Sequence, residues 1–485
     1  MKTYGRRKLV VNLREYELNE KVIGETLLEI LPIHFQNVDE INYLKGVYRG
    51  YQDILFKRKD VRPSINNKVV ENIAYHIVEF KKGYVFGDPI QYVQRETSDK
   101  AELNLLNDYM LENNKSAKDK DLAEDLYCCG QSYRAVLARQ NGSVPFELNN
   151  VDPTNAFVAY SSDISETKLF AGHISLGKNS DYSVMIYTRD MIYYYDVAVS
   201  TKKKVKTVSN ITIDNVKFNS KSNNPLGQIP IFEYALNKSR LGIIELVKDG
   251  LDTLNQITSS DLDDIEQFVQ SLLLFVNQEV DIATLTALLE VGAIQIMSND
   301  PKLPADVKVL SNKLLHSETK IFYDRVMGNL LTIAGVPRMT DKVSSGDTGQ
   351  ARLLGEGWTM ADERAKQDEL SFKMAEKEML RLTLEICKQV NGSGIKKLEM
   401  KDIEIKFTRN RSDNMLVKTQ ALLNMKQAKV APEVAFSVIG LFADPNEVVK
   451  QSQSYYGEDF WEKDEEVIET QEQFEADINP IVNNE

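Results

Sequence analysis

The stretch from Ser311 to Val390 constrains the fold most, because two long apolar patterns enclose a polar segment. From Leu314 to Ala334, apolar residues recur at every third or fourth position, which predicts an amphipathic helix. The segment Arg338–Gly346 has no apolar period and predicts a loop. A second helix is expected to begin at Asp347, a residue type that caps helix N-termini well.

The second predicted helix is unusually long. Its apolar stripe continues to Val390, so a helix of about forty residues would span about 60 Å at 1.5 Å per residue. Gly355 and Gly357 are poor helix formers and predict a kink near its start. An ordinary core does not need a helix of this length, so the sequence favours a large or elongated assembly.

Composition excludes some classes of function. The chain has 485 residues and a net charge of −13. This length predicts roughly three domains, and the hydrophobic content of 42% suffices for a sizeable core. Proteins that coat nucleic acids gain affinity from clustered Lys and Arg, so the acidic balance argues against that role.

The cysteines and the hydropathy pattern predict reduced thiols and no membrane span. Cys128, Cys129 and Cys387 have no framework spacing, and adjacent cysteines pair poorly, so we expect reduced thiols in a cytoplasmic environment. The apolar run Leu9–Val11 is too short for a signal peptide. No stretch approaches eighteen apolar residues, so no membrane span is predicted.

The first part of the chain is predicted to be helical after an irregular arm at residues 1–20. The expected helices are Leu18–Leu31, Val38–Ile54, 67–83, and two within Asp99–Asn113 and Lys118–Tyr127. Pro32 is expected to end the first of them, and Asn67 and Gly83 to bound the third. Residues 131–236 then alternate short β-rich runs with turn signals, which predicts strands.

A helix is predicted again from Arg240 to Phe268, with an apolar stripe on one side. Its other side is acidic, with the carboxylates Asp249, Asp252, Asp261, Asp263 and Asp264. We expect this acidic face to lie in solvent or in a channel.

A compact insert follows this helix. It is predicted to contain an apolar run at Leu272–Val276, a helix at Ile282–Leu289, and strands at Ile294–Met297 and Val307–Leu310. The C-terminal part predicts a strand within Leu398–Phe407, then helices at Asn414–Met425, Ala431–Leu441 and Pro445–Tyr456. The acidic residues after Gly457 predict a frayed or disordered end.

Catalytic motifs are missing. The sequence has no phosphate-binding loop, no dinucleotide fingerprint, no zinc-protease motif and no nucleophile elbow. Asp261, Asp263 and Asp264 are the best metal candidates, but residues two apart on a helix face different ways. The residues therefore predict an α+β, mainly helical assembly protein, with no cofactor and no bound metal. The alternative is a metal-dependent nuclease that uses these carboxylates.

Three clusters of residues resemble the portal proteins of tailed bacteriophages, in the branch typified by phage SPP1. Their order and spacing fit along nearly the whole chain. The first is Val47–Gly50, Asn66–Lys68 and Gly83–Ile90; the second is Pro225–Ile231 with Asp252, Asn255, Ser259, Ser260 and Asp261; the third is Gly335–Gln350, the long helix, Phe407–Arg411 and Asp444–Glu447. The Leu272–Asn277 run and the acidic tail are less typical of the family.

The resemblance implies a portal fold, a ring that is usually dodecameric, at one vertex of the capsid, assembled in the host cytoplasm. It divides the chain into a wing (1–238), a stem helix (239–270), a clip (271–312), a second stem helix (313–336), a tunnel loop (337–346), a long helix linking wing and crown (347–399), and a helical crown with an acidic tail (400–485).

The resemblance also implies partners. DNA would enter through the channel during packaging and leave at ejection, with weak, non-specific contacts. The clip would dock the terminase motor and later the head–tail adaptors, and the ring would meet the major capsid and scaffolding proteins. The tunnel loop would face DNA with Arg338, Met339, Thr340, Asp341, Lys342, Val343, Ser344 and Ser345. Another oligomeric capsid or adaptor protein is the remaining alternative.

Overall fold

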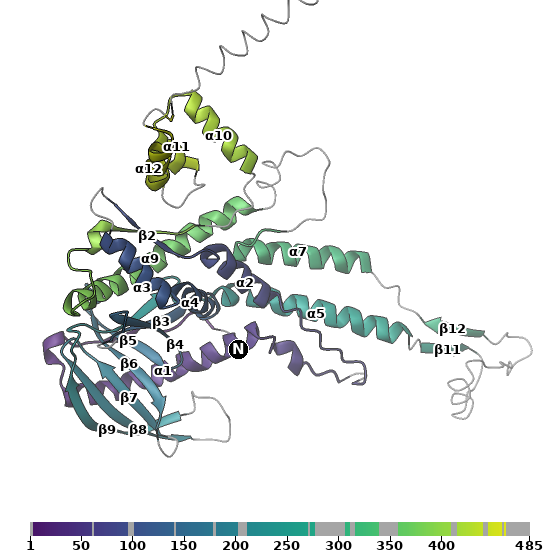
Figure 1. The fold of residues 1–485 in the computed structure, drawn as a ribbon. Coiled ribbons are helices and arrows are strands. Elements are labelled where there is room, and N and C mark those ends of the chain that lie inside the picture. The colour runs from purple at the N-terminus through teal and green to yellow at the C-terminus, as the bar shows by residue number, and fades with distance from the viewer. Residues whose placement is uncertain are drawn as a thin grey trace, which may run out of the picture.

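The computed structural model describes residues 3–60, 63–95, 101–139, 142–177, 181–201, 211–269, 272–276, 306–310, 316–338, 357–408, 415–439, 445–457 and 460–461. The predicted α+β class is confirmed (Figure 1). The description "mainly helical" was too strong, because helices hold about half of the described residues and four sheets hold much of the rest.

The larger sheet has six strands and is covered by one long helix. Its strand order is β1-β5-β6-β7-β8-β9, with β1 parallel to β5 and the other pairs antiparallel. Leu27 and Phe35 of the helix α1 pack against Phe157 and Phe170 of the sheet. The elements are α1 (Glu20–Tyr48), β1 (Leu9–Val11), β5 (Ala156–Ser161), β6 (Lys168–Leu176), β7 (Tyr182–Tyr187), β8 (Met191–Thr201) and β9 (Ile211–Asn223).

Helix α1 corrects a prediction. It runs for 29 residues through Pro32 instead of ending there. An interior proline removes a hydrogen bond and costs about 3 kcal/mol. Leu27, Leu31 and Phe35 are buried on both sides of it, and each such side chain stabilises the helix by about 1.5–3 kcal/mol. Burial against the sheet therefore outweighs the local penalty.

A second body surrounds a three-stranded antiparallel sheet of order β10-β3-β4. Strand β3 is buried along most of its length, because helices cover one of its faces and the first sheet lies on the other. The elements are β3 (Gln131–Ala138), β4 (Phe146–Val151), β10 (Ile231–Ala235), α2 (Ile73–Phe86), α3 (Ala101–Glu112), α4 (Lys115–Cys129) and α9 (Trp358–Gln389). A further pair joins β2 (Gln91–Gln94) to β13 (Ile403–Lys406).

Two predicted helix boundaries are corrected. Helix α2 is capped by Asn72, not Asn67, and it continues through Gly83 to Phe86. Helix α9 has 32 residues, fewer than predicted, and starts after Gly357, whose φ of 84° interrupts a helix. The predicted start at Asp347 lies outside the described residues. Gly357, one of the two glycines expected to kink the helix, is therefore the residue just before its first turn.

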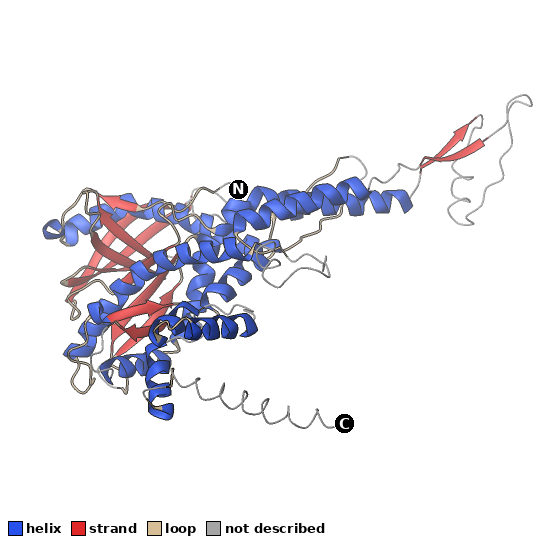
Figure 2. Cartoon of the chain, turned by 90° about the horizontal axis from the view of Figure 1, so that it is seen from above, coloured by secondary structure: helices blue, strands red, loops and turns tan. Residues whose placement is uncertain are grey.

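Helices α5 (Ile243–Val269) and α7 (His316–Ala334) project together from the second body. They lie side by side in both views, with the hairpin of β11 (Leu272–Val276) and β12 (Asp306–Leu310) beyond their far end (Figures 1 and 2). The two predicted helices and the predicted strand at Val307–Leu310 are confirmed, and the apolar run Leu272–Val276 forms the second strand of the hairpin. The predicted helix at Ile282–Leu289 and strand at Ile294–Met297 lie outside the described residues.

The C-terminal helices form a small group above the second body (Figure 1). They are α10 (Met415–Gln427), α11 (Pro432–Ile439) and α12 (Pro445–Tyr456), as predicted. Short 3-10 turns occur at Glu15–Glu17, Asp53–Phe56 and Met400–Asp402. Among the described helices, none combines the length and apolar character that crossing a membrane requires.

Candidate functional site

The α5/α7 pair is packed most tightly near its root. Leu251 and Leu254 of α5 are buried with Leu330 of α7 in the main core. Gly250 permits this close approach, because a Cβ atom there would lie 3.1 Å from a terminal methyl carbon of Leu330. The two helices therefore leave the body as one packed unit.

A second face of α5 binds an extended segment that we call the strap, residues 57–60 and 63–72. The Asn255 side-chain oxygen accepts a hydrogen bond from the backbone amide of Glu71 at 2.8 Å, and the Ser259 hydroxyl oxygen accepts one from the backbone amide of Val69 at 3.0 Å. The next contact in this row is Asp263, which accepts the Asn67 amide at 2.6 Å. The strap thus runs antiparallel to α5, with alternate amides satisfied by helix side chains.

The spacing of these contacts has a simple geometric cause. Side chains four residues apart on a helix lie about 6.0 Å apart along its axis, and alternate amides of an extended chain lie about 6.6 Å apart. Asn255, Ser259 and Asp263 are four residues apart and so line one face. Helix and strap can therefore stay in register over three successive contacts.

Asp263 is the most heavily bound residue of this row. Its carboxylate accepts hydrogen bonds from the ammonium groups of Lys57 at 3.1 Å and Lys59 at 3.2 Å, in addition to the one from the Asn67 amide. Burial on its own raises the pKa of Asp263, but these hydrogen bonds outweigh it and lower the pKa to about 2. The prediction that Asp263 faces solvent or a channel was wrong, because the carboxylate is buried against the strap.

Glu71 of the strap ties both projecting helices together. Its carboxylate accepts one hydrogen bond from the hydroxyl of Thr258 on α5 and another from the hydroxyl of Tyr323 on α7. Burial raises the pKa of Tyr323 above its ordinary value, and the Glu71 carboxylate adds to this effect. The strap therefore fixes the two helices to each other as well as to the body.

The other predicted carboxylates have varied surroundings. Asp252 forms an ion pair with Lys248, whereas Asp249 and Asp264 are exposed and Asp261 is half-buried. Within the described residues, no group of three His, Cys, Asp or Glu side chains could hold a metal ion. The acidic side of α5 thus divides into a strap-binding face and an exposed face.

The N-terminal arm holds the root of α5. Arg6 forms ion pairs with Glu245 on α5 and with Glu40 on α1, and all three side chains are nearly inaccessible to solvent. Gly5 donates its amide to Glu245 at 3.0 Å. Its φ is +87°, and a Cβ atom there would lie 2.1 Å from the carbonyl oxygen of Ser239. Only glycine fits this position, which the sequence alone did not indicate.

The predicted DNA-facing loop begins at the end of α7. Gly335 has a φ of +68°, which confirms the predicted end of the helix. Arg338 is exposed, and its guanidinium lies 3.9 Å from Asp324. Arg338, Arg325 and Met360 help to line a hollow of about 480 Å³ between α7 and the start of α9. The residues Met339 to Ser345 lie outside the described part of the chain.

A buried charge network fixes α9 on the other side of this loop. Glu376 lies 2.8 Å from Lys115 and accepts hydrogen bonds from Tyr92 and Tyr234. Burial opposes ionisation, but Lys115 and Arg134 hold the pKa of Glu376 below its ordinary value. The network also includes Asp119, which lies 2.8 Å from Arg134. It joins α9 to β2, α4, β3 and β10.

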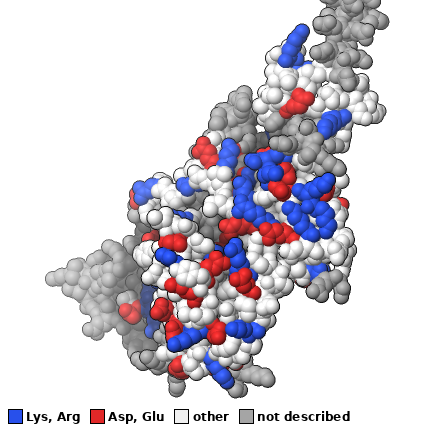
Figure 3. Space-filling model, turned by 90° about the vertical axis from the view of Figure 1, so that its left-hand side faces the viewer, with Lys and Arg blue, Asp and Glu red and all other residues white. Residues whose placement is uncertain are grey.

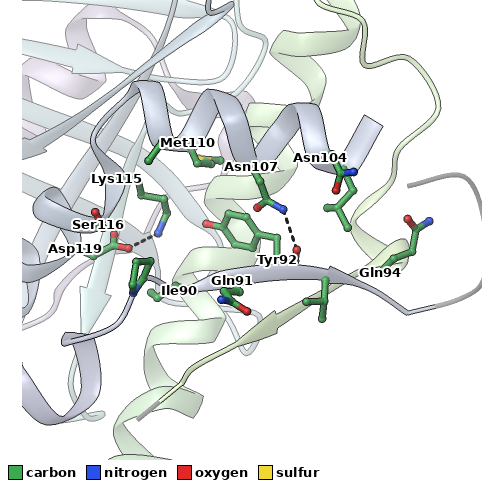
Figure 4. Close-up of a pocket in the computed structure, with 14 residues that line it drawn as sticks. Ile90, Gln91, Tyr92, Gln94, Asn104, Asn107, Met110, Lys115, Ser116 and Asp119 are labelled. Carbon is green, nitrogen blue, oxygen red and sulfur yellow. Dashed lines mark hydrogen bonds and ion pairs between the residues drawn. The ribbon is translucent and has the colours of Figure 1, made fainter. Parts of the chain in front are cut away.

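A hollow of about 550 Å³ lies between β2 and α3 (Figure 4). Asn107 spans it and donates to the Tyr92 carbonyl oxygen at 3.1 Å. Lys115 and Asp119 at one end are paired with each other at 2.5 Å and belong to the buried network. None of the sequence-predicted site residues lines this hollow.

The surface charges on the face seen in Figure 3 are mixed. Lys and Arg side chains gather in the upper part of the face seen in Figure 3, with carboxylates among them. Near the end of α9, Lys396 donates to the carbonyl oxygens of Lys388 and Val390, so its charge caps the helix C-terminus. Such a surface is typical of a solvated exterior.

The described architecture is that of a structural subunit with a long helical projection. The sequence profile of the SPP1 Gp6-like phage portal proteins matches residues 27–459. The chain therefore belongs to the SPP1 Gp6-like family of phage portal proteins. It is a virion component at the portal of the capsid, it takes part in DNA packaging, and its family implies an oligomeric ring without catalytic activity.

Two other comparisons add little. No curated protein sequence matches the chain. A solved chain from "Virion of native gene transfer agent (GTA) particle" is 11% identical, with a TM-score of 0.42, and the match covers 76% of this chain and 90% of that one. The family match overturns the nuclease alternative, since the family is structural.

The first prediction concerns the strap. Asp263→Asn removes the charge that binds Lys57 and Lys59, and we expect the strap to loosen by roughly 2 kcal/mol, or about thirtyfold in amide exchange. Hydrogen exchange of the peptide containing Asn67, Val69 and Glu71 measures this change. The exposed neighbour Asp264→Asn is the control and should change stability by less than about 0.5 kcal/mol. Equal effects of the two variants would contradict the assignment.

The strap also predicts a pH dependence. The pKa of Asp263 is lowered to about 2, so its contribution to stability is complete above the ordinary aspartate pKa of about 4. The contribution is lost as the pH falls through about 2. Exchange of the strap amides should therefore rise in this window in the wild type and stay nearly flat in Asp263→Asn.

The second prediction concerns the buried network. Glu376→Gln leaves Lys115 and Arg134 with one carboxylate, and breaking a buried charge network costs about 3–5 kcal/mol. The free energy of unfolding in urea measures this loss. Glu363→Gln on the exposed side of the same helix is the control. If both substitutions have similarly small effects, the network does not hold α9 in place.

Proposed function

We propose that twelve copies of this chain, or a similar number, form a ring through which DNA enters the capsid and later leaves it. One observation carries the proposal: the α5/α7 pair projects from the body as a packed unit, braced by the strap and the N-terminal arm. Projections of this kind, repeated around an axis, can build the wall of a channel.

The regions of the chain are proposed as follows. The elements of the two bodies that lie within residues 1–238 form the wing. Helices α5 and α7 form the stem (239–270 and 313–336), and the hairpin β11/β12 belongs to the clip (271–312). Residues 337–346 form the tunnel loop, and 347–399 contain the long helix between wing and crown. Because β13 pairs with β2, we propose that the crown begins after residue 408, later than the boundary at residue 400.

The proposed contacts with DNA are weak. In the tunnel loop, Arg338 and Lys342 would make a few reversible contacts with phosphates. Asp249 and Asp264, which stay exposed on α5, with Asp261 beside them, would repel the DNA backbone. A channel that lets DNA slide must avoid tight phosphate binding, so this combination suits a conduit.

The proposed protein partners follow from the same arrangement. The hairpin β11/β12 lies beyond the far end of the projection, and the clip to which we assign it would dock the terminase during packaging and the head–tail adaptor afterwards. The wing would meet the major capsid and scaffolding proteins. The energy for DNA movement would come from the terminase, because this sequence has no nucleotide-binding loop.

Replacement of the tunnel loop tests this proposal. Replacing Arg338–Ser345 by a Gly-Ser linker of the same length should leave ring formation intact and lower the amount of packaged DNA by roughly an order of magnitude. Electron microscopy measures the first result, and nuclease-protected DNA measures the second.

The matched control removes two positive charges elsewhere. The Lys21→Ser, Arg189→Ser variant changes exposed residues of the wing and should package normally. Normal packaging by rings that carry the linker would contradict the tunnel-loop assignment.

A further inference from the structure

We propose that the C-terminal segment 462–478 folds back as an amphipathic helix onto the outer face of α11 and completes the core of the α10–α12 group. The outer face is formed by Val434 and Val438. Its occupant is thus a segment of the same chain, an acidic helix with one apolar side. Such docking does not depend on a ring, so it goes beyond the proposed function.

The α10–α12 group has a small core. Helix α11 contacts both α10 and α12. Among the described residues of the group, the buried apolar side chains are Ala435, Phe436, Ile439 and Val449. No side chain described between residues 418 and 427 of α10 is buried. Groups of about forty residues seldom bury enough apolar surface to be stable by themselves. The group therefore needs a further packing partner.

Helix α11 is apolar on two opposite sides. Its inner side carries the buried residues Ala435, Phe436 and Ile439. On its outer side, Val434 and Val438 are 51% and 64% exposed. These two valines are one turn apart and differ by only about 40° in direction around the helix. A helix that is apolar on all sides belongs inside a domain, so the outer face of α11 is a surface that another element should cover.

The described chain ends beside the start of α11. Trp461 donates its indole N–H to the carbonyl oxygen of Val430 at 2.9 Å, and its ring centroid lies 5.5 Å from that of Phe436. Val438 is about 12 Å from Val430 along the helix. Val467 is six residues after Trp461, and an extended link of that length reaches about 20 Å. The segment is therefore long enough to reach the outer face.

The sequence of the segment has the pattern of an amphipathic helix. Val467, Phe474 and Ile478 are separated by seven and four positions, so on a helix they would lie within about 40° of one another. Pro480 follows, and proline is a common residue just beyond a helix end. An isolated helix of this length is marginal in water, which agrees with the disordered end that the composition predicts. Packing on α11 supplies the burial that the segment lacks alone.

The charges of the segment and of the group are complementary. Residues 462–478 contain eight carboxylates and one lysine. Residues 415–430, which end where Trp461 binds, contain no Asp or Glu but carry Lys418, Lys426 and Lys429. Charges within about 10 Å of each other still attract at moderate salt. The docked segment thus gives the group an acidic exterior, which under the proposed function would face the packaged DNA and repel it.

Hydrogen exchange of the full-length protein tests the docking. In the wild type, peptides from residues 466–478 should exchange at least about tenfold more slowly than an unstructured peptide of the same sequence. In the Val434→Asp, Val438→Asp variant they should exchange at the unstructured rate, because the new carboxylates remove the apolar contact and repel the segment. Both positions are exposed, so the inner side of α11 stays intact.

A second variant changes the segment and leaves the group untouched. Phe474→Asp, Ile478→Asp removes two residues of the apolar stripe and should also raise exchange of the segment to the unstructured rate. The matched control is Gln473→Asp, Ala476→Asp, which adds the same charge on the other side of the predicted helix. This control should keep the exchange rate of the wild type.

Three outcomes would overturn the docking. The first is a wild-type segment that exchanges at the unstructured rate. The second is protection that persists in Val434→Asp, Val438→Asp, because the segment would then bind elsewhere. The third is a freely exchanging segment together with rings that disperse in that variant, because a neighbouring copy would then cover the face. Absence of rings in the wild type would instead count against the proposed function, so the two failures are distinguishable.

Discussion

Helix α5 depends on one geometric match: polar side chains one turn apart meet alternate amides of an extended strap. Asn255, Ser259 and Asp263 provide these acceptors, and the strap in return carries Glu71 to Tyr323 on α7. The projecting pair therefore gains support on a face that would otherwise be open to water. Its stiffness follows from hydrogen bonds at three heights and an apolar contact with α7, rather than from helix propensity.

Charge is used in two different ways in this chain. Where charges are buried, as at Glu376 or Arg6, they are held by several partners from different elements and fix the helices to the body. Other carboxylates of α5, such as Asp249 and Asp264, are exposed to solvent. The buried groups explain how the projection is anchored, and the exposed groups suit a surface over which DNA must slide.

Much of this architecture could be predicted from the sequence. The apolar periods of α5, α7 and α9 and the alternation in residues 131–236 gave the right types of element, because local patterning and burial agree there. The stop predicted at Pro32 failed, because contacts with a distant sheet outweigh a local penalty. Asn67 was read as a cap because its residue type suits one, but its partner Asp263 lies far away in sequence.

The candidate site was likewise predictable from the sequence only where local patterns decide its features. The carboxylates on α5 could be found by periodicity, but which of them are exposed could not, because the strap that covers Asp263 comes from another part of the chain. Similarly, nothing near Gly5 or Arg6 in sequence indicates that they hold the root of α5. Pairings between distant segments decide these questions, and a single sequence does not encode them in any local pattern.

Electron microscopy of the purified protein, with image averaging, tests the central claim most directly. The account predicts rings with a central opening and about twelve subunits, in which the α5/α7 pairs surround the opening and run along its axis. Rings whose helix pairs point outward, away from the opening, would contradict the account. A closed assembly with no opening would contradict it as well.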